Sequence, residues 1–177
     1  MSELDYSAAE HDQTEEELTR EARMASEAEA SLIHLMLCDN GVYRASSVKS
    51  EWFSGTMWRK AYGAIKSLVD QQQIADYISV SDYLGGTDPN VNWLASLAEL
   101  NRNCMARTES VETYVSILRE GYARRSAERI AHRLMTESRK GQAAIDAAIK
   151  ELMELDSVEA NHDHDAKTIV RGALEDT

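Results

Sequence analysis

The sequence predicts an all-α protein from its composition and from the spacing of its apolar residues. Only one proline and eight glycines occur in 177 residues, and Ala, Leu, Glu and Arg are abundant, which favours helix throughout. Apolar residues recur at intervals of three and four, as on one face of an α-helix. No run of alternating β-branched residues is long enough to predict a sheet.

The formal net charge is −12, and it is unevenly distributed. Residues 3–29 and the tail after Gly141 are acidic, whereas residues 102–140 are net basic. This argues against a protein that surrounds nucleic acid with its whole surface, but it leaves one local basic face. No basic segment follows Met1, and no apolar run approaches the ~18 residues of a membrane span. We therefore expect a cytoplasmic protein without a membrane segment.

Residues 1–25 carry many acids and little apolar periodicity, which predicts an acidic flexible tail. A core helix is then expected from Ser26. Ser26 and Glu29 have capping-box spacing, and four apolar residues follow at helical intervals: Leu32, Ile33, Met36 and Leu37. Asn40-Gly41 is expected to end this helix, because both residues tolerate the left-handed conformation.

The rest of a globular head is expected over residues 42–107. A short helix over 42–49 precedes Trp52-Phe53, which we expect to anchor a loop on the core, and residues 56–71 form an amphipathic helix. The run 78–84 is ambiguous between a strand and a short helix capped by Ser79 or Ser81. Residues 85–90 read as a loop. Asn90 or Asn92 then caps a helix that carries Leu94, Leu97, Ala98 and Leu100.

Residues 108–156 predict a helical hairpin with a tight turn at Gly141. Its first helix opens at Ser110, and its second carries an apolar stripe of Ile145, Ala148, Ile149, Leu152 and Met153. Each helix has apolar residues beyond one seam, so a second copy of the chain is the expected partner. The residues expected to pack within and between subunits are Val111, Tyr114, Leu118, Tyr122, Ile145, Ile149 and Leu152. Residues 157–177 predict a polar linker and the start of a docking helix over 166–174.

The sequence contains no pattern that assembles a catalytic centre, so no enzyme activity, cofactor or metal is expected. The run His162-Asp163-His164-Asp165 is the one cluster of metal-ligand type, and we favour a solvated linker there. His34 is expected to be a core or interface histidine. Four arginines line the first hairpin helix: Arg124, Arg125, Arg129 and Arg133. They form a nucleic-acid or partner face, or, as we prefer, a solvated flank that pairs with nearby acids.

Five motifs in order resemble the N-terminal domain of DnaB-type replicative DNA helicases. They are Glu27-Ala28-Glu29 before the apolar helix that ends at Asp39-Asn40; Trp52-Phe53 before the amphipathic helix; Asp76 to Val80 with Leu84; Trp93 to Ala98; and Ser110 to Glu120 followed by Arg124-Arg125. The resemblance covers about residues 26–156. His34 stands where a glycine is usual and Trp58 where a histidine is usual, and the loop at Gly85-Gly86 is short. These departures indicate a divergent member, such as a phage-encoded one.

The resemblance implies a helical head (residues 26–107), a hairpin (108–156) and the start of a linker helix. It also implies self-association as a dimer, or as a trimer of dimers in a hexameric helicase. The expected partners are the C-terminal domain of primase and a helicase loader, with weak or no direct DNA binding. ATP hydrolysis would belong to a separate domain. In the hexameric helicase, these N-terminal domains would form a collar on the motor. The alternatives are a stand-alone phage accessory protein that mimics this collar, or a small DNA-binding protein that uses the Arg124–Arg133 face.

Overall fold

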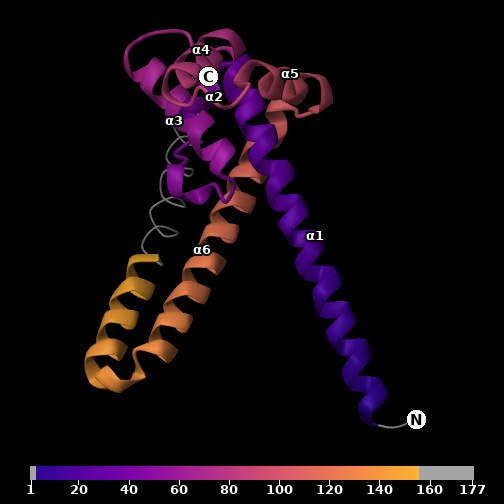
Figure 1. Cartoon of the computed structure of the whole chain (residues 1–177), viewed down its shortest axis with the longest axis vertical. Helices are drawn as coiled ribbons and strands as arrows, with labels where there is room; N and C mark the ends of the chain where they lie inside the picture. The colour runs from indigo at the N-terminus through magenta and orange to yellow at the C-terminus, as the bar shows by residue number, and fades with distance from the viewer. Residues whose placement is uncertain (1–2, 156–177) are drawn as a thin grey trace, which may run out of the picture. The chain divides into compact units, whose positions relative to one another are not determined.

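The structure is a computed structural model that describes the backbone of residues 3–155 and the side chains of residues 19–155. Over this range the protein is all-α and contains no strand (Figure 1). Its elements are α1 (Glu3–Cys38), α2 (Asn40–Ala45), η1 (Ser50–Trp52), α3 (Thr56–Asp70), α4 (Tyr77–Thr87), α5 (Trp93–Asn103), η2 (Thr108–Ser110), α6 (Val111–Thr136), η3 (Ser138–Lys140) and a last helix over residues 142–155. The expected docking helix and the run His162–Asp165 lie outside the described residues.

The chain divides into two compact units, Met1–Gly121 and Tyr122–Thr177. The division falls within α6, which continues from the first unit into the second. The sequence had placed the boundary between head and hairpin earlier, before residue 108.

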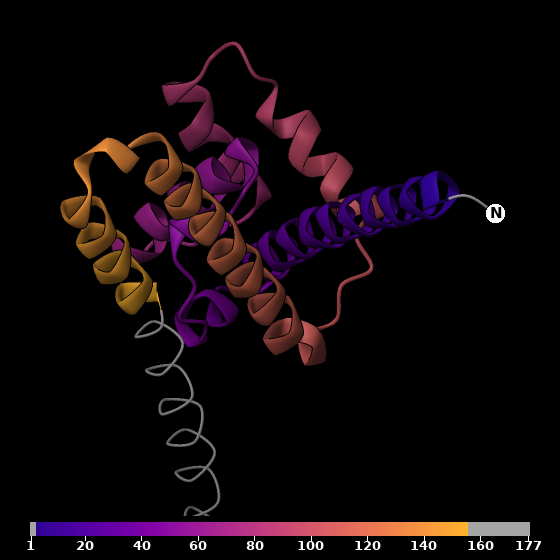
Figure 2. The ribbon, with the colours of Figure 1, turned by 90° about the horizontal axis from the view of Figure 1, so that it is seen from below.

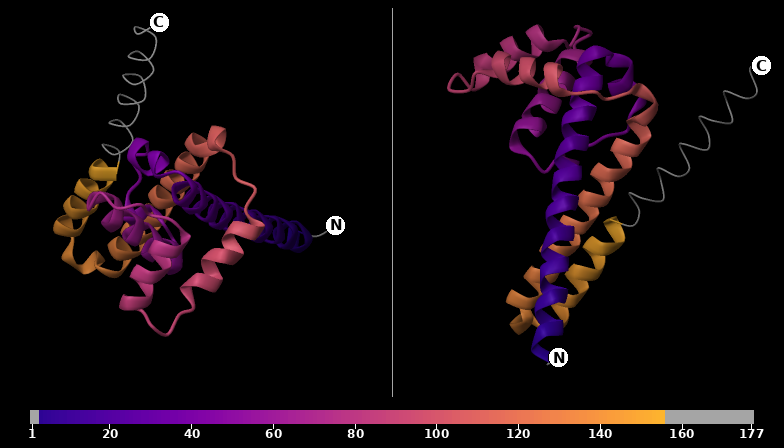
Figure 3. Two further views of the ribbon diagram at one scale, coloured as in Figure 1. Left: turned by 90° about the horizontal axis from the view of Figure 1, so that it is seen from above. Right: turned by 90° about the vertical axis from the view of Figure 1, so that its right-hand side faces the viewer.

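The first unit is the helical head, in which α2, α3 and α5 pack on α1, and α4 packs on α3 and α5 (Figure 1). The C-terminal part of α1 supplies the centre of the core, where Leu32, Ile33 and Met36 are fully buried. The views in Figure 3 show that the N-terminal part of α1 extends away from α2–α5. The prediction of a central apolar helix is confirmed.

The expected start of that helix at Ser26 is wrong, because α1 begins at Glu3. Residues 3–25, expected to be a tail, belong to the same helix. The segment before Ser26 is rich in Glu and Ala and holds no Gly or Pro, so nothing in it interrupts a helix. Glu29 does not serve a capping box with Ser26. It is buried and accepts hydrogen bonds from Ser54 and Gly55, just before α3.

The expected left-handed stop at Asn40-Gly41 is also wrong, since neither residue has a positive φ. α1 ends because Asp39 is extended, and the Asp39 carboxylate caps α2 by accepting from the N–H of Gly41. Asn40 instead joins two segments. Its Nδ2 donates to the carbonyls of Met36 and Ala75, and its Oδ1 accepts from the N–H of Ala75.

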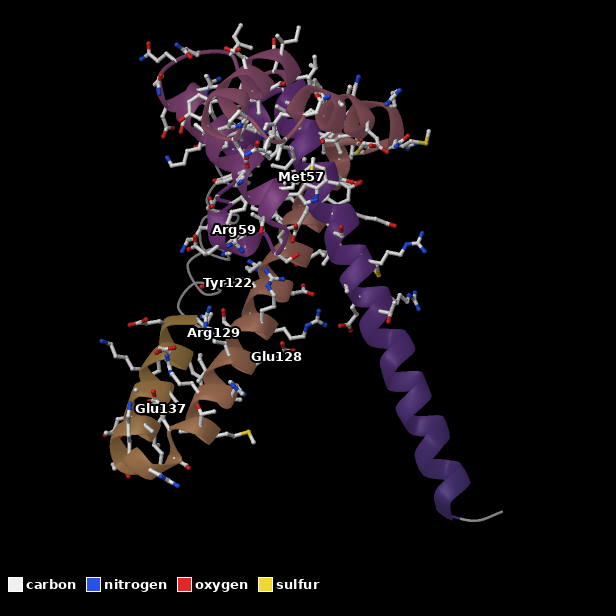
Figure 4. The ribbon with its side chains drawn as sticks, viewed as in Figure 1. Met57, Arg59, Tyr122, Glu128, Arg129 and Glu137 are labelled. Atoms are coloured by element: carbon white, nitrogen blue, oxygen red, sulfur yellow. The ribbon has the colours of Figure 1, made fainter. Side chains whose placement is uncertain are left out.

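Trp52 and Phe53 are buried, as expected for anchors of a loop on the core. Arg59, labelled in Figure 4, fixes the same loop to α3 by donating from Nη2 to the carbonyl oxygen of Phe53, at 2.6 Å. Tyr62 on α3 packs on Phe53 and donates its hydroxyl to the carbonyl of Val48. Burial raises the pKa of Tyr62 to about 12. The amphipathic helix predicted over 56–71 is confirmed, because α3 spans Thr56–Asp70 and buries one apolar face.

The ambiguous run 78–84 is helical and lies within α4. Its cap is Asp76, whose carboxylate accepts from the N–H groups of Ile78 and Ser79 while Ser79 Oγ accepts from the N–H of Asp76. These N–H donors, that of Ser79 first, hold the pKa of Asp76 below its usual value. Gly85-Gly86 was expected to be a loop, but α4 continues through both, with an ordinary negative φ.

Asn92 caps α5 by accepting from the N–H of Ala95, which confirms one of the two predicted caps. The buried face of α5 differs from the expected one, because Trp93 is buried while Leu94 and Ala98 are exposed. Leu97 and Leu100 are buried as expected.

Candidate functional site

The second unit is a helical hairpin formed by α6 from Tyr122 onward and the last helix over residues 142–155. The two helices run antiparallel and side by side in both Figure 1 and Figure 2. They are joined through η3 and Gly141, which has φ +60° and ψ −129°. This conformation is open to glycine and strained for residues with a Cβ. The predicted glycine turn is confirmed.

The seam between the hairpin helices is built from small and medium apolar side chains. Ile130 on α6 is buried, as are Ala144 and Ala148 on the last helix. Alanines at four-residue spacing let two helix backbones approach closely. Arg133 and Glu151 form an ion pair across the seam, with Nη2 and Oε1 2.6 Å apart. The side that the last helix presents to α6 is therefore that of Ala144, Ala148 and Glu151.

An apolar stripe on the same helix remains exposed. Ile145, Ile149 and Leu152 have exposed fractions of 43%, 50% and 46%, and Met153 reaches 69%. The sequence predicted one stripe containing these four residues and Ala148. The structure divides it, because Ala148 lies in the seam while the other four present much of their surface to solvent. A continuous row of large apolar side chains on one helix is typical of an interaction surface.

Charged residues border this stripe on the side away from the seam. A shallow hollow of about 370 Å³ is lined by Asp146, Ile149, Lys150, Met153 and Glu154. Asp146, Lys150 and Glu154 follow one another at four-residue intervals, so they form one row along the helix. We call Ile145, Ile149, Leu152 and Met153 the apolar stripe, and these three charged residues the charged row.

The seven residues expected to pack within or between subunits fall into three groups. Leu118 is buried within the chain. Val111, Tyr114 and Tyr122 are half-buried. Ile145, Ile149 and Leu152 are exposed and belong to the apolar stripe. Of the seven, these last three are the ones that the structure leaves most available to a second copy, and their part in an interface stays a prediction.

The four arginines do not form one uniform face. Arg125, Arg129 and Arg133 are spaced by four residues and share one side of α6, whereas Arg124 precedes this row by one position and points about 100° away from it. Arg133 is engaged by Glu151, an acid on the neighbouring helix, as the solvated-flank interpretation expected. Arg129, labelled in Figure 4, donates to Ser126 Oγ at 3.5 Å.

His34 lies on α1 in a small polar cluster of the head. Its Nδ1 is 2.5 Å from the hydroxyl oxygen of Tyr77, and its Nε2 is 3.7 Å from Cys38 Sγ. The imidazole is half-buried, and this burial lowers the pKa of His34. Burial together with the neighbouring Cys38 raises the pKa of Tyr77. His34 is thus a hydrogen-bonded structural histidine of the head.

Within the described side chains, no group of three or more His, Cys, Asp or Glu residues is placed to hold a metal ion. Nor does any described helix have the length and apolar character needed to cross a membrane.

The family model of the DnaB-like helicase N-terminal domain matches residues 21–120, which is more than half of the chain. The chain belongs to this family. The match includes the C-terminal half of α1, all of α2–α5 and the beginning of α6, and it stops just before the second unit. Among curated proteins, none matches the chain in sequence.

Solved structures show that the fold is that of DnaB N-terminal domains. The crystal structure of the N-terminal domain of DnaB helicase from Mycobacterium tuberculosis aligns with a TM-score of 0.64 and 20% identity, over 72% of this chain and 95% of that one. A DnaB-like replicative helicase, solved for its interactions with primase, aligns with a TM-score of 0.61 and 22% identity, over 73% of this chain. The aligned part is 31% of that helicase, so this chain corresponds to about a third of its length.

In this DnaB-like domain, the seam of Ala144 and Glu151 and the charged row beside the stripe are features that the sequence patterns above did not predict. The row had a signal, since acid, lysine and acid recur at exact four-residue spacing in residues 146–154. Glu29 was misassigned because its partners, Ser54 and Gly55, are 25 and 26 residues away in the chain. No local pattern indicates such a contact.

Proposed function

We propose that this chain is the non-catalytic N-terminal collar domain of a replicative DNA helicase. In this role it self-associates through its hairpin and docks primase or a helicase loader during DNA replication in the cytoplasm. ATP hydrolysis belongs to a separate domain of the helicase. Membership of the DnaB-like family and the DnaB N-terminal fold support the proposal.

The observation that carries self-association is the apolar stripe. Four large apolar side chains, each at least 43% exposed, follow one another along a single helix. The helix spans 14 residues, about 21 Å, so the stripe is long enough for a second helix to pack along it. Covering it removes apolar surface from water, at roughly 25 cal/mol per Å². A second hairpin presents the same stripe, so a two-fold pair buries both at once.

Sedimentation analysis of the whole chain, alone and with Ile149→Asp, tests this proposal. Ile149 is half exposed, so the fold is expected to survive the substitution while self-association weakens by at least tenfold, because a charge is then buried in the interface. The matched control is Ile78→Asp, on an isoleucine that is 73% exposed in the head. A chain that stays a monomer at high concentration, or equal self-association of both variants, contradicts hairpin pairing.

We propose primase as the partner because one solved structure of similar fold is a DnaB-like replicative helicase studied with its interactions with primase. Titration of the C-terminal domain of primase from the same genome into the chain tests this role. We expect a saturable heat of binding. Its loss in Ile78→Asp would place the primase surface on the head, and its loss in Ile149→Asp would place that surface on the hairpin. If primase shows no binding at concentrations up to about 100 μM, a level at which weak specific complexes still form, the primase part of the proposal is wrong.

DNA binding through Arg124–Arg133 has less support, because Arg133 is engaged by Glu151 and the chain carries a net charge of −12. A gel-shift assay at low and high salt distinguishes the two roles. DNA binding that depends steeply on salt and is lost in Arg125→Glu would favour the DNA-binding alternative. The stand-alone accessory protein is distinguished by the downstream coding sequence. A reading frame that continues into a nucleotide-binding domain excludes it.

A further inference from the structure

Two large apolar side chains are exposed where the chain passes from α3 into α4. Ile74 and Ile78 have exposed fractions of 75% and 73%, higher than those of the other described isoleucines. The start of α4 does not need them, because the two positions that form a hydrophobic staple around a cap are taken by Ala75 and Val80, both fully buried. A pair of exposed isoleucines beside a satisfied cap is typical of an interaction surface.

The backbone that carries these isoleucines is held on several sides. Asn40 donates to the carbonyl of Ala75 and accepts from its N–H, and Ser79 Oγ donates to the carbonyl of Ile74 at 2.8 Å. Gln72 has φ +60° and, among the described residues, is the one non-glycine with a positive φ. Such a conformation is costly and persists where the surroundings fix it. The corner is therefore ordered before binding, which lowers the entropic cost of covering it.

The outer side of α4 continues the surface from Ile78. Asp82 and Gly85 follow Ile78 at four and seven residues, so they lie on the same side of the helix, and both are exposed. A Cβ at Gly85 would meet no atom within 4 Å, and its φ is negative, so nothing within the described chain requires glycine there. Glycine weakens a helix but lets another backbone approach closely. We call Ile74, Ile78, Asp82 and Gly85 the α4 face.

The charge around the α4 face has one sign. Residues 67–101 contain no Lys, Arg or His and five acids, which are Asp70, Asp76, Asp82, Asp88 and Glu99. Lys66 pairs with Asp70 and Lys60 with Asp88, whereas the exposed Asp82 lies on the face itself. A basic partner is favoured by such a field. A second copy is disfavoured, because a two-fold pair would set this acidic face against itself.

We infer that the α4 face docks a helix of a partner protein, one that carries a row of apolar residues flanked by lysine or arginine. Ile74 and Ile78 cover the apolar row, Asp82 pairs with a flanking cation, and Gly85 admits the backbone of the partner helix. The inference rests on the partner-docking part of the proposed function, and it adds the surface and the chemistry of the segment that fits it.

A synthetic peptide tests this fit on the whole chain. The probe is a helical peptide of about 18 residues with leucines on one face and lysines elsewhere, and the matched control peptide carries glutamates in place of the lysines. Titration is followed by the amide NMR spectrum of the chain. We expect saturable shifts confined to residues 72–86, with the lysine peptide binding at least about tenfold more tightly than the glutamate peptide.

Variants of the α4 face locate the binding. Ile78→Asp is expected to weaken it by about tenfold and Asp82→Lys by about fivefold. Met105→Asp and Glu99→Lys make the same charge changes at exposed positions elsewhere in the head, and each should alter the dissociation constant by less than about twofold. Gly85→Leu is expected to weaken binding at least about fivefold while the urea midpoint of the head does not fall, since leucine favours helix.

Three results overturn the inference. Equal binding by Ile78→Asp and Met105→Asp would show general attraction to a chain of net charge −12. Equal binding of the two peptides would remove the basic flank. Weaker self-association of Ile78→Asp would assign the face to a second copy.

The C-terminal domain of primase separates this inference from the proposed function. If primase binds and Ile78→Asp leaves that binding unchanged while the peptide does not bind, the proposed docking of primase stands and the α4 face is wrong. If primase does not bind but the lysine peptide occupies the α4 face, the inference stands and primase is the wrong partner.

Discussion

Glu29 is expected to be the most sensitive polar residue of the head, because its buried carboxylate holds the start of α3. The side chain comes from α1 and is 1% exposed. Its Oε1 accepts from the N–H and the hydroxyl of Ser54, both at 2.6 Å, and its Oε2 accepts from the N–H of Gly55 at 3.1 Å. These N–H groups lie at the N-terminus of a helix, where backbone donors lack partners within the helix and a negative charge is favourable.

The expected losses follow from these contacts. A hydrogen bond to a charged group contributes about 1.5–3 kcal/mol, and a buried donor without a partner is itself costly. Glu29→Ala removes three such bonds and leaves a void, so the head should lose about 3–4 kcal/mol of unfolding free energy. Glu29→Gln fills the same space but sets an amide donor against an N–H donor, and its expected loss is about 2 kcal/mol.

Urea unfolding followed by tryptophan fluorescence measures these losses. Trp52, Trp58 and Trp93 all lie in the first unit, so the signal reports the head and not the hairpin. Glu27→Ala is the control, because the Glu27 carboxylate is exposed and its ion pair with Arg23 should contribute less than about 0.5 kcal/mol. A loss below about 1 kcal/mol for Glu29→Ala, or equal losses for Glu27→Ala and Glu29→Ala, would refute the capping argument.

Three further predictions concern the turn and two titrating groups. Gly141→Ala should destabilise the hairpin by about 1–3 kcal/mol, seen as faster amide exchange in residues 142–155, whereas Gly63→Ala, with open space at its Cβ, should stabilise α3 slightly. Asp76→Ala should cost about 1 kcal/mol at pH 7. Because folding lowers the pKa of Asp76, that stabilisation is present above about pH 4 and is lost as the pH falls through the folded pKa. The difference in stability between the variant and the original chain should therefore shrink with acidification in urea titrations. Folding also lowers the pKa of His34, so as the pH falls this histidine is protonated in the unfolded chain before it is protonated in the folded one. The free energy of unfolding should therefore fall as the pH drops below about 6.5. His34→Gln should flatten this dependence of the unfolding free energy on pH between about pH 7.5 and 5.5. An unchanged slope in His34→Gln would assign the pH dependence to other groups.

Local sequence patterns determined most of the helices of this protein. The three- and four-residue spacing of apolar residues predicted α3, α6 and the core part of α1, because each helix must bury one face. Turn chemistry predicted a cap at Asn90 or Asn92, of which Asn92 is the one used, and it predicted the hairpin turn at Gly141. Each depends on a single residue type at one backbone position. The order of five motifs gave the DnaB-like family.

Tertiary structure decided what local patterns left open or made ambiguous. Gly85-Gly86 signals a turn by composition, yet α4 continues through it and ends at Thr87. Ser26 and Glu29 have the spacing of a capping box, but Glu29 satisfies donors on another helix instead. In the hairpin, one apolar stripe in the sequence became a buried seam and an exposed face.

The physical reason is the range over which each interaction acts. Helix periodicity, caps and glycine turns depend on neighbours within four or five residues, so the sequence alone specifies them. Which face of a helix is buried, and which carboxylate meets which N–H group, depends on partners that folding brings from tens of residues away. The last helix shows both levels: its spacing made it amphipathic, but only packing against α6 chose Ala144 and Ala148 for the seam. That choice left Ile145, Ile149 and Leu152 exposed.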